Sequence, residues 1–348
     1  MNKYIITRIS ILFAVVILFN GCSIPKVTQR TENKNTPNTY GNNSKPTDTL
    51  NSAKISWRTF FTDSNLVHLI DTALVHNQEL MITLQEIEIA KNDIRVKKGE
   101  LLPTVNYGLE VGADKVGRYT SQGAGDEATE IKPGKKVPQI LGDFKFGVDM
   151  EWEIDIWKKL RNAKKAAIKR YLATIEGKNF VLTNLIAEVA KSYYELVALD
   201  NQLNVVRQNI ITQKNALEIV KIQKEASRAT ELAVKKFEAE VLGTQSKEFE
   251  ILQQIKETEN KINFLLGRFP QEIPRNRDNF EQMIPPIVYA GIPAQLLQNR
   301  PDIKQAEFQL DATKLDVKVA KAEFYPSLKI SASIGLDAFN PAFWIKIP

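Results

Sequence analysis

Thirteen consecutive residues in the middle of the chain alternate without exception between apolar side chains and polar or small ones. The apolar positions are Phe144, Phe146, Val148, Met150, Trp152, Ile154 and Ile156, and the positions between them are Lys145, Gly147, Asp149, Glu151, Glu153 and Asp155. This period-two pattern predicts a β-strand with one apolar and one polar face. Soluble sandwiches are the commoner source of such strands, but their strands usually have about five or six residues. The greater length here favours a membrane β-barrel.

The N-terminal residues have the pattern of an exported protein. Two basic residues precede an apolar run over 9–19, which is too short to span a bilayer and is typical of a secretory signal. The only cysteine, Cys22, follows directly. We therefore interpret residues 1–21 as a lipoprotein signal peptide and Cys22 as the acylated first residue of the mature chain. An ordinary cleavage site with an accidental cysteine is the alternative. Residues 22–56, rich in Asn, Thr, Lys and Pro, are expected to form a flexible, lipid-anchored tether.

A strand in lipid must have its backbone groups paired on both sides, so only closed barrels cross a membrane as strands. A shorter alternation over 105–111 predicts a second strand, and the charged, Gly-rich segment 113–142 is expected to be a long exposed loop. Two or three strands cannot close a barrel, so we expect an oligomeric one. In that barrel the lipid-facing residues are Phe144, Phe146, Val148, Met150 and Trp152, and the lumen-facing residues are Asp149, Glu151, Glu153 and Asp155.

Long helices follow the strand. Residues 157–225 contain no proline and a single glycine, and their apolar positions are nearly heptad. They predict one helix of roughly 100 Å. After a small-residue break at 226–230, a return helix is expected over 231–266. A short helix over 64–77 and a second over 78–101 precede the first strand. We expect the return helix and the second helix, placed end to end, to pair with the long helix.

The chain also contains an internal repeat. Shifted by 223 residues, a first set of positions coincides with identical residues in a second set. The first set is Asp93, Val96, Lys98, Glu100, Pro103 and Gly112, and the second is Asp316, Val319, Lys321, Glu323, Pro326 and Gly335. Both copies change from helix period to strand period at the proline. The repeat therefore predicts a second helix–proline–strand unit, whose strand alternates at Leu328, Ile330, Ala332, Ile334 and Leu336.

Composition argues against an enzyme and against a nucleic-acid-binding protein. The net charge is +6, and the basic pairs lie within helical patterns without interleaved aromatic residues. His68 and His76 are the only histidines, and the sequence has no Gly-rich phosphate loop and no cluster with metal-ligand spacing. We therefore predict no cofactor and no metal. The strand carboxylates allow acid–base chemistry in principle, but a polar lumen wall accounts for their alternation better.

Four segments resemble one known family, the TolC-like outer-membrane efflux lipoproteins of the NodT-type branch. They are Trp57-x-x-Phe60-Phe61-x-Asp63-x-x-Leu66-x-x-Leu69-Ile70-x-x-Ala73-Leu74-x-x-Asn77, Trp152-Glu153-Ile154-Asp155-Ile156-Trp157-x-x-Leu160-Arg161, Asn263-x-Leu265-Leu266-Gly267 followed by Ile292-Pro293-x-x-Leu296-Leu297-x-x-Arg300-Pro301-Asp302-Ile303, and Ala320-x-Ala322-x-Phe324-Tyr325-Pro326-Ser327. The third is the most specific, because Pro301 suits a first helical turn and Asp302 complements the helix dipole.

The resemblance implies a mixed fold, in which long antiparallel coiled-coil helices form a periplasmic α-barrel and strands contribute to an oligomeric transmembrane β-barrel. The helical domain would comprise 57–102 and 158–325, and the strands 103–157 and 326–348. It implies a homotrimer in the outer membrane that docks on a periplasmic adaptor and an inner-membrane pump, without cofactor or catalytic residues. The hairpin tip, at Ser227, Arg228 and Ala229, would contact the adaptor, and Arg300, Pro301 and Asp302 would join the two repeats.

Two departures from the family pattern change these expectations. The family continues through a fourth strand and a second helical hairpin after the position of Pro348, so we expect residues 1–348 alone not to form a working channel. Ala226-Ser227 stand where the family has glycine at the tip. The main alternative function is a lipid-anchored periplasmic coiled-coil scaffold that forms no pore. The exported compound, the cognate pump and the gating residues are not indicated by the sequence.

Overall fold

The computed structural model describes residues 33, 35–37, 51–52, 55–276 and 293–345. The chain divides into two compact units, one that includes Lys91–Lys169 and Leu310–Pro348, and one that includes Thr31–Ala90 and Arg170–Gln309. The expected domain boundaries fall at the strand ends, whereas the boundaries between these units fall within helices. Cys22 and the proposed signal peptide lie outside the described residues.

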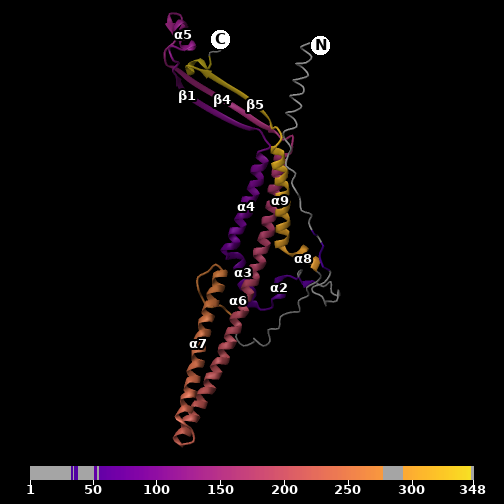
Figure 1. Ribbon diagram of the computed structural model, residues 1–348, viewed down its shortest axis with the longest axis vertical. Helices are drawn as coiled ribbons and strands as arrows, with labels where there is room; N and C mark the ends of the chain where they lie inside the picture. Colours follow the sequence, from indigo (N-terminus) through magenta and orange to yellow (C-terminus); the bar gives the residue numbers. More distant parts are fainter. Residues whose placement is uncertain (1–32, 34, 38–50, 53–54, 277–292, 346–348) are drawn as a thin grey trace, which may run out of the picture. The chain divides into compact units, whose positions relative to one another are not determined.

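The first unit contains a three-stranded antiparallel sheet. Strand β4 (Leu141–Ile154) lies between β1 (Thr104–Asp114) and β5 (Leu328–Ala338), as Figure 1 shows. All three strands were predicted, and β4 has 14 residues. The register places Gly147 between Gly108 and Gly335, so glycines from all three strands form one row across the sheet.

The expected loop between β1 and β4 is more ordered than the sequence indicated. It contains helix α5 (Ser121–Ala128) and a hairpin of β2 (Glu130–Lys132) and β3 (Lys135–Lys136). Thr120 caps α5 by accepting a hydrogen bond from the Gly123 amide. An added Cβ on Gly123 would lie 2.2 Å from the Gly117 carbonyl oxygen, so close backbone contact holds this substructure together. The prediction of a plain loop was wrong because glycine disfavours a helix, and composition alone does not reveal that Gly123 packs against the backbone of Gly117.

The second unit is built around a helical hairpin. Helix α6 (Lys159–Glu225) and helix α7 (Glu231–Leu265) run side by side, separated by a turn at the expected break (Figure 1). Helices α2 (Trp57–Phe60) and α3 (Ser64–His76) precede α4 (Gln78–Gly99). Arg207 of α6 pairs with Glu248 of α7, with 2.8 Å between Nε and Oε1. The predicted bounds of the helices agree with these elements to within about two residues.

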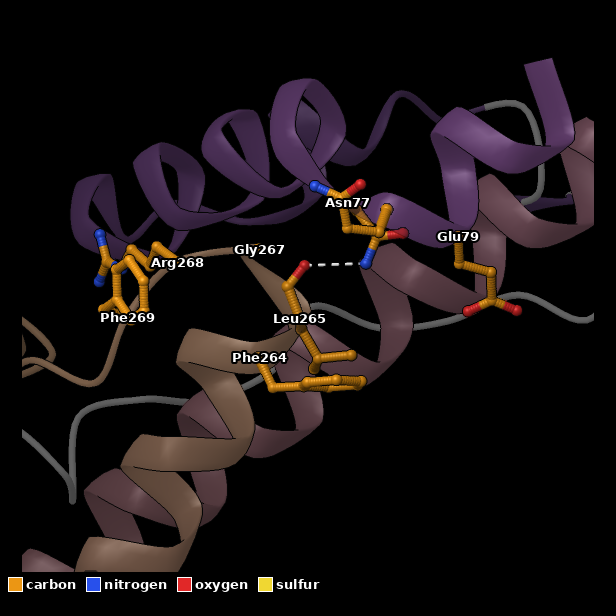
Figure 2. Close-up of a pocket in the computed structure, with 8 residues that line it drawn as sticks. Asn77, Glu79, Phe264, Leu265, Gly267, Arg268 and Phe269 are labelled. Carbon is orange, nitrogen blue, oxygen red and sulfur yellow. Dashed lines mark hydrogen bonds between the residues drawn. The ribbon is translucent and has the colours of Figure 1, made fainter. Parts of the chain in front are cut away.

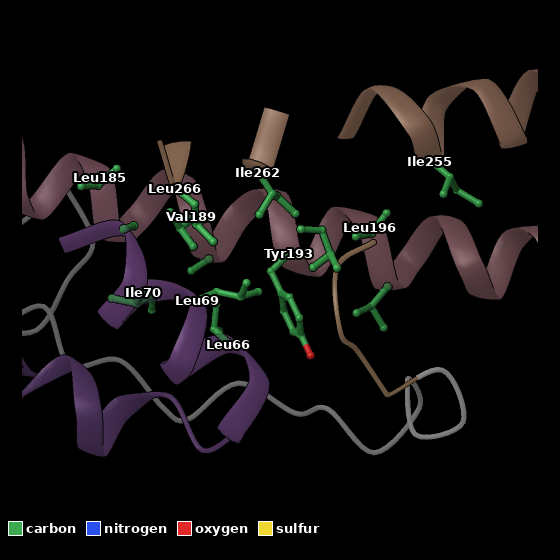
Figure 3. Packing of buried hydrophobic residues seen from close by; sticks show 14 of the residues in the cluster. Leu66, Leu69, Ile70, Leu185, Val189, Tyr193, Leu196, Ile255, Ile262 and Leu266 are labelled. Atoms are coloured by element: carbon green, nitrogen blue, oxygen red, sulfur yellow. The ribbon is translucent and has the colours of Figure 1, made fainter. Parts of the chain in front are cut away.

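The core of the second unit forms where α3 and α7 meet α6 (Figure 3). Its buried side chains include Leu66, Leu69 and Ile70 from α3, Val189, Tyr193 and Leu196 from α6, and Ile255, Ile262 and Leu266 from α7 and its end. Tyr193 is fully buried, and its hydroxyl donates to Asp63 Oδ2 at 2.7 Å. The other oxygen of Asp63 accepts from the Asn65 amide and caps α3. Burial, together with the hydrogen bond to Asp63, raises the pKa of Tyr193.

A corner joins the end of α7 to the start of α4 (Figure 2). Asn77 Nδ2 donates to the Leu265 carbonyl at 2.9 Å, and Asn77 Oδ1 accepts from the Leu80 amide, so one side chain caps α4 and binds α7. Gly267 has φ +63°, and an added Cβ would lie 2.3 Å from the His76 carbonyl oxygen. The small cavity at this corner, of about 310 Å³, has exposed Phe264 and Phe269 at its edge. Two helices thus meet end to end here, as predicted.

A buried ion-pair network fixes the segment after α7. The Arg275 guanidinium pairs with Asp200 of α6 and with Glu259 of α7, at 3.0 Å from Nη2 to Asp200 Oδ1 and 2.8 Å from Nη1 to Glu259 Oε1. The Arg275 side chain is only 2% exposed. Burial opposes ionisation of Glu259, but hydrogen bonds from Arg275 and Lys256 outweigh it and lower its pKa. Because the partners are far apart in sequence, no local pattern predicted this network.

The predicted repeat is present in the structure. Helix α9 (Pro301–Glu323) leads into β5 as α4 leads into β1, and α8 (Pro293–Asn299) precedes α9. Both repeats therefore place a strand at an edge of the described sheet, on either side of β4.

Candidate functional site

One face of the sheet is apolar throughout. Paired residues in neighbouring strands point to the same side, so the register brings three alternating sets together. They are Val105, Tyr107, Leu109 and Val111 of β1, Phe144, Phe146, Val148, Met150, Trp152 and Ile154 of β4, and Leu328, Ile330, Ala332, Ile334, Leu336 and Ala338 of β5. The five side chains expected to face lipid all belong to this set.

This apolar face is open. Tyr107 is 85% exposed and Ile334 is 78% exposed, although both lie in the middle of their strands. Monomeric soluble proteins rarely expose a contiguous apolar surface of this kind, and such surfaces mark contact with a protein or a membrane. The apolar face is therefore a candidate contact surface.

The opposite face is polar. Asp149 lies between Asn106 and Ser333 in the register, and Glu151 lies between Thr104 and Ser331. Lys329 Nζ is 2.7 Å from Glu151 Oε1. The carboxylates at 149, 151 and 153 thus share the face opposite the apolar one, as the alternation predicted.

A notch crosses the polar face at the glycine row. On one side of it Lys145 lies between Glu110 and Asp337, and on the other side lies Asp149. Because the glycines carry no side chains, they leave a depression of about 420 Å³ between these charged rows. The polar face thus presents charged and hydrogen-bonding groups to water, and the depression leaves space for solutes.

Asp155 requires a correction. It lies beyond the end of β4, and its carboxylate accepts hydrogen bonds from the Leu160 and Arg161 amides, both at 3.0 Å. Asp155 therefore caps α6 and does not belong to the polar face. The strand ends because capping a helix requires a turn after Ile154, a demand that simple alternation does not reveal.

Two tryptophans fix the helix-to-strand junctions. Trp152 Nε1 donates to the Leu101 carbonyl at 3.1 Å, next to the first repeat's proline turn. Trp157 Nε1 donates to the Pro326 carbonyl at 2.9 Å and stacks on Tyr325, with 4.5 Å between ring centroids. Sequence reasoning treated Trp157 as the start of the helix, but α6 begins two residues later. The prolines at equivalent positions of the two repeats, Pro103 and Pro326, were the available signal for where these contacts lie.

At the other end of β4, the segment that follows β5 contacts the start of β4. Trp344, just after the 3-10 helix η3 (Pro341–Phe343), donates from Nε1 to the Phe144 carbonyl at 3.1 Å. Its ring lies 6.5 Å from that of Phe146, centroid to centroid. Aromatic side chains thus lie at both ends of the apolar face.

The hairpin turn between α6 and α7 is tight and exposed. Ser227 adopts φ +57°, the left-handed conformation that glycine usually supplies, and the Arg228 amide donates to the Gln223 carbonyl at 2.8 Å. Thr230 caps α7 through its hydroxyl. Ser227 and Arg228 are exposed, and Ala229 is half-buried. These three side chains are therefore placed at the turn, where the sequence predicted the tip.

The residues that join the repeats have a local structural role. Pro301 is the first residue of α9 and Asp302 lies in its first turn, as expected. Arg300 Nε donates to Asp302 Oδ1 at 3.0 Å, and this hydrogen bond lowers the pKa of Asp302.

The described residues contain no group of three or more His, Cys, Asp or Glu side chains that could hold a metal ion. None of the helices in the described part of the chain is both long enough and apolar enough to cross a membrane.

A sheet with an exposed apolar face indicates a protein that contacts a membrane or another protein. The sequence comparisons identify the family. The chain matches the outer membrane efflux protein family over residues 69–268 and 292–340. It belongs to this family, a family of transport proteins.

Curated relatives include a probable efflux pump outer membrane protein, SepC of Pseudomonas putida, which is 28% identical over 284 residues. That match covers 81% of this chain and 56% of SepC. The cation efflux system protein CusC of Escherichia coli is 26% identical over 327 residues, covering 92% of this chain and 66% of CusC. The chain thus spans between about half and two thirds of the length of these relatives.

Solved structures agree on the fold. The open-state MtrE outer membrane channel of Neisseria gonorrhoeae has a TM-score of 0.75 at 20% identity, covering 93% of this chain and 69% of MtrE. A CusC crystal structure has a TM-score of 0.70 at 22% identity, covering 84% of this chain and 65% of CusC. The chain therefore has the fold of the outer membrane channels, with long helices and a few strands.

Proposed function

We propose that this protein is the outer-membrane channel subunit of a tripartite efflux system, which exports small molecules from the periplasm to the exterior. The observation that carries the proposal is the described sheet, which has one exposed apolar face and one polar face and continues into long helices. Relatives named as efflux pump outer membrane proteins support it.

The sheet explains how the protein would sit in the membrane. Its apolar face would contact lipid, and its polar face would line a water-filled lumen. The outer strands of the described sheet have unpaired edges, which a bilayer does not tolerate, so strands from further copies would have to close the barrel. We infer the homotrimer that the family resemblance implies, with Asp149, Glu151 and Glu153 lining its lumen.

The channel would act as a passive conduit and not as an enzyme. Asp149 and Glu151 would keep the lumen hydrated, and the glycine row would leave it locally wider. The named cargoes of relatives differ, since one is a toluene efflux protein and another a cation efflux protein. The cargo is therefore proposed only as small molecules or drugs.

The remaining assignments complete the proposal. Acylated Cys22 would anchor the chain in the outer membrane through the tether. The tip at Ser227, Arg228 and Ala229 would contact a periplasmic adaptor, which would connect the channel to an inner-membrane pump.

Efflux in the native bacterium tests this function. Disrupting the gene should raise intracellular accumulation of an exported dye such as ethidium, and restoring the complete reading frame should return accumulation to its original level. Unchanged accumulation with ethidium and with other efflux dyes would contradict an efflux role.

Membrane extraction separates the channel from a lipid-anchored scaffold without a pore. A protease site placed in the tether (22–56) is cut in isolated outer membranes, which are then washed with carbonate. A channel subunit should stay in the membrane because its strands are embedded. A scaffold should be released by the cut. The uncut sample is the control, because a scaffold with its lipid anchor intact should stay in the membrane.

A further inference from the structure

The start of α6 carries an unusual concentration of positive charge. Residues 158–170 contain seven basic side chains and no acidic one. The whole chain has a net charge of +6, so subtracting this +7 leaves −1 for all other residues. The net positive charge of the chain is therefore no larger than the charge of this junction and the first turns of α6.

This placement opposes the helix dipole. Cations are unfavourable near a helix N-terminus, where anions are stabilising, and α6 has no acidic residue in its first turn. The first amides of α6 are already satisfied by Asp155. Anions from outside the helix would therefore stabilise the positive side chains at the start of α6.

Partners within the chain account for only part of this charge. Lys159 pairs with Glu153, and Lys169 Nζ is 2.9 Å from Asp311 Oδ2. Arg161 makes a longer contact with Asp155, 3.4 Å from Nε to Oδ2, and its side chain is 60% exposed. The side chains of Lys158, Lys164 and Lys165 have no hydrogen bond or ion pair to any described residue, and Lys158 and Lys165 are exposed.

The other basic side chains lie on a different side of α6 from Lys159. Lys159 reaches Glu153, which belongs to that face. At about 100° per residue, Arg161, Lys164 and Lys165 lie roughly 120° to 160° around the helix from Lys159. They therefore lie on the side of α6 away from Lys159 and its contact with Glu153.

Aromatic side chains lie at the same junction. Trp152, Trp157 and Tyr325 are each more than one-third exposed, and all three are held by the contacts at the helix-to-strand turns. Tryptophan and tyrosine favour the membrane–water interface, where their rings lie at the level of the lipid headgroups. The basic side chains thus begin where a headgroup layer would lie.

We propose that the basic junction, defined as Lys158, Arg161, Lys164 and Lys165, binds the headgroups of anionic phospholipids in the leaflet that the strands enter. This inference rests on the proposed function, because it requires the sheet to be in a membrane. The charge complementarity is direct, since clustered basic side chains beside a membrane-embedded segment attract anionic lipid. The contact fixes the height of the sheet and supplies the anions that the start of α6 lacks.

Tryptophan quenching by brominated lipids tests the proposal on the full chain reconstituted in vesicles. A Trp57→Phe/Trp344→Phe background leaves Trp152 and Trp157, both at the junction, as the only tryptophans. Vesicles contain phosphatidylethanolamine and phosphatidylglycerol, and either one or the other is brominated near the top of its acyl chains. At equal mole fraction, brominated phosphatidylglycerol should quench more strongly, with an enrichment of up to about fivefold for each basic side chain engaged.

Two variants that remove the same amount of positive charge from different places show which residues cause the preference for phosphatidylglycerol. Lys158→Gln/Arg161→Gln/Lys164→Gln/Lys165→Gln should abolish the preference for phosphatidylglycerol and keep quenching by phosphatidylethanolamine, which shows that the chain still inserts. The control Lys214→Gln/Lys224→Gln/Lys236→Gln/Lys247→Gln removes the same charge from the α6–α7 hairpin and should keep the preference. Salt should weaken the wild-type preference.

The outcomes separate this inference from the function on which it rests. Equal quenching by both lipids in the unmodified background would show that the sheet is in the membrane and would overturn the lipid site. An equal loss of preference in the two charge variants would also overturn it, since net charge alone would then explain the effect. Quenching by neither lipid would contradict the membrane location of the sheet, and with it the proposed function.

Discussion

A lysine in place of Ile334 should prevent the sheet from inserting into a bilayer, whereas a lysine in place of Ser333 should not. The two residues are neighbours in β5 and point to opposite faces. Ile334 lies in the apolar row beside Val148, and Ser333 lies in the polar row beside Asp149. The two substitutions introduce the same charge at the same depth, so only the face differs.

The structure sets the size of the effect. Ile334 and Ser333 lie in the middle of an 11-residue strand, so both are near the midplane of a bilayer that the strand spans. A lysine on the lipid face of a barrel costs about 2–4 kcal/mol at the midplane. That corresponds to roughly a 30- to 900-fold shift in the insertion equilibrium. On the other face, the lysine at 333 faces water and gains Asp149 as an ion-pair partner.

Folding into lipid vesicles across a urea series measures this difference. The free energy of folding into the bilayer should be the same for Ser333→Lys as for wild type to within about 1 kcal/mol, because exposed ion pairs contribute little. The Ile334→Lys protein should insert only at much lower urea, or not at all. Equal midpoints for the two variants would refute the assignment of the two faces, whether both insert normally or both fail.

Three further predictions test other parts of the account. Cys22 should incorporate a fatty-acid analogue during metabolic labelling and Cys22→Ala should not, so equal labelling of the two would exclude the anchor. Single-cysteine crosslinking to the adaptor should peak at Ser227, Arg228 and Ala229, and peaks only near Trp157 would reverse the proposed orientation. Arg275→Gln should lower the free energy of unfolding of the helical unit by about 3–5 kcal/mol, since it removes the buried guanidinium that pairs with both Glu259 and Asp200. Exposed Arg207→Gln should cost less than about 1 kcal/mol, so similar losses in urea unfolding would contradict the burial argument.

The Arg275 network also has a predicted pH dependence. Hydrogen bonds hold the pKa of Glu259 below its ordinary value, despite the opposing effect of burial. A carboxyl group with a lowered folded-state pKa contributes stability above its unfolded-state pKa, and this is lost as the pH falls through the lowered value. Comparing acid unfolding of wild type with that of Arg275→Gln measures this contribution, which should be smaller in the variant.

The regular elements were predictable because their patterns are local. The alternation from Phe144 to Ile154 requires no information beyond the side chains themselves, and the strand ends where Asp155 turns to cap α6. Similarly, the absence of proline over 159–225 and the small residues at 226–230 place the helices and their turn. The shift of 223 residues located β5 from β1 before any contact was known.

The features that were missed depend on residues far apart in sequence. Arg275 reaches Asp200 across 75 positions, and Trp157 reaches Pro326 across 169. Neither contact produces a periodic pattern. Helix α5 was missed for a different reason: its two glycines disfavour a helix, and the local packing of Gly123 against Gly117 is not visible in composition. The Lys164 and Lys165 pair was visible in the sequence, but its significance depends on the neighbouring ion pairs and aromatic contacts.

Cysteine accessibility along β4 in native outer membranes tests the central claim most directly. Single cysteines are placed in turn at each position from 144 to 154 in a Cys22-containing chain, where acylation blocks the native thiol. A membrane-impermeant, water-soluble maleimide should label positions 145, 147, 149, 151 and 153 and leave the even-numbered positions unlabelled, while a lipid-soluble reagent should give the opposite pattern. Uniform labelling by the water-soluble reagent along the strand would contradict a membrane-embedded sheet with one face toward lipid and one toward a lumen.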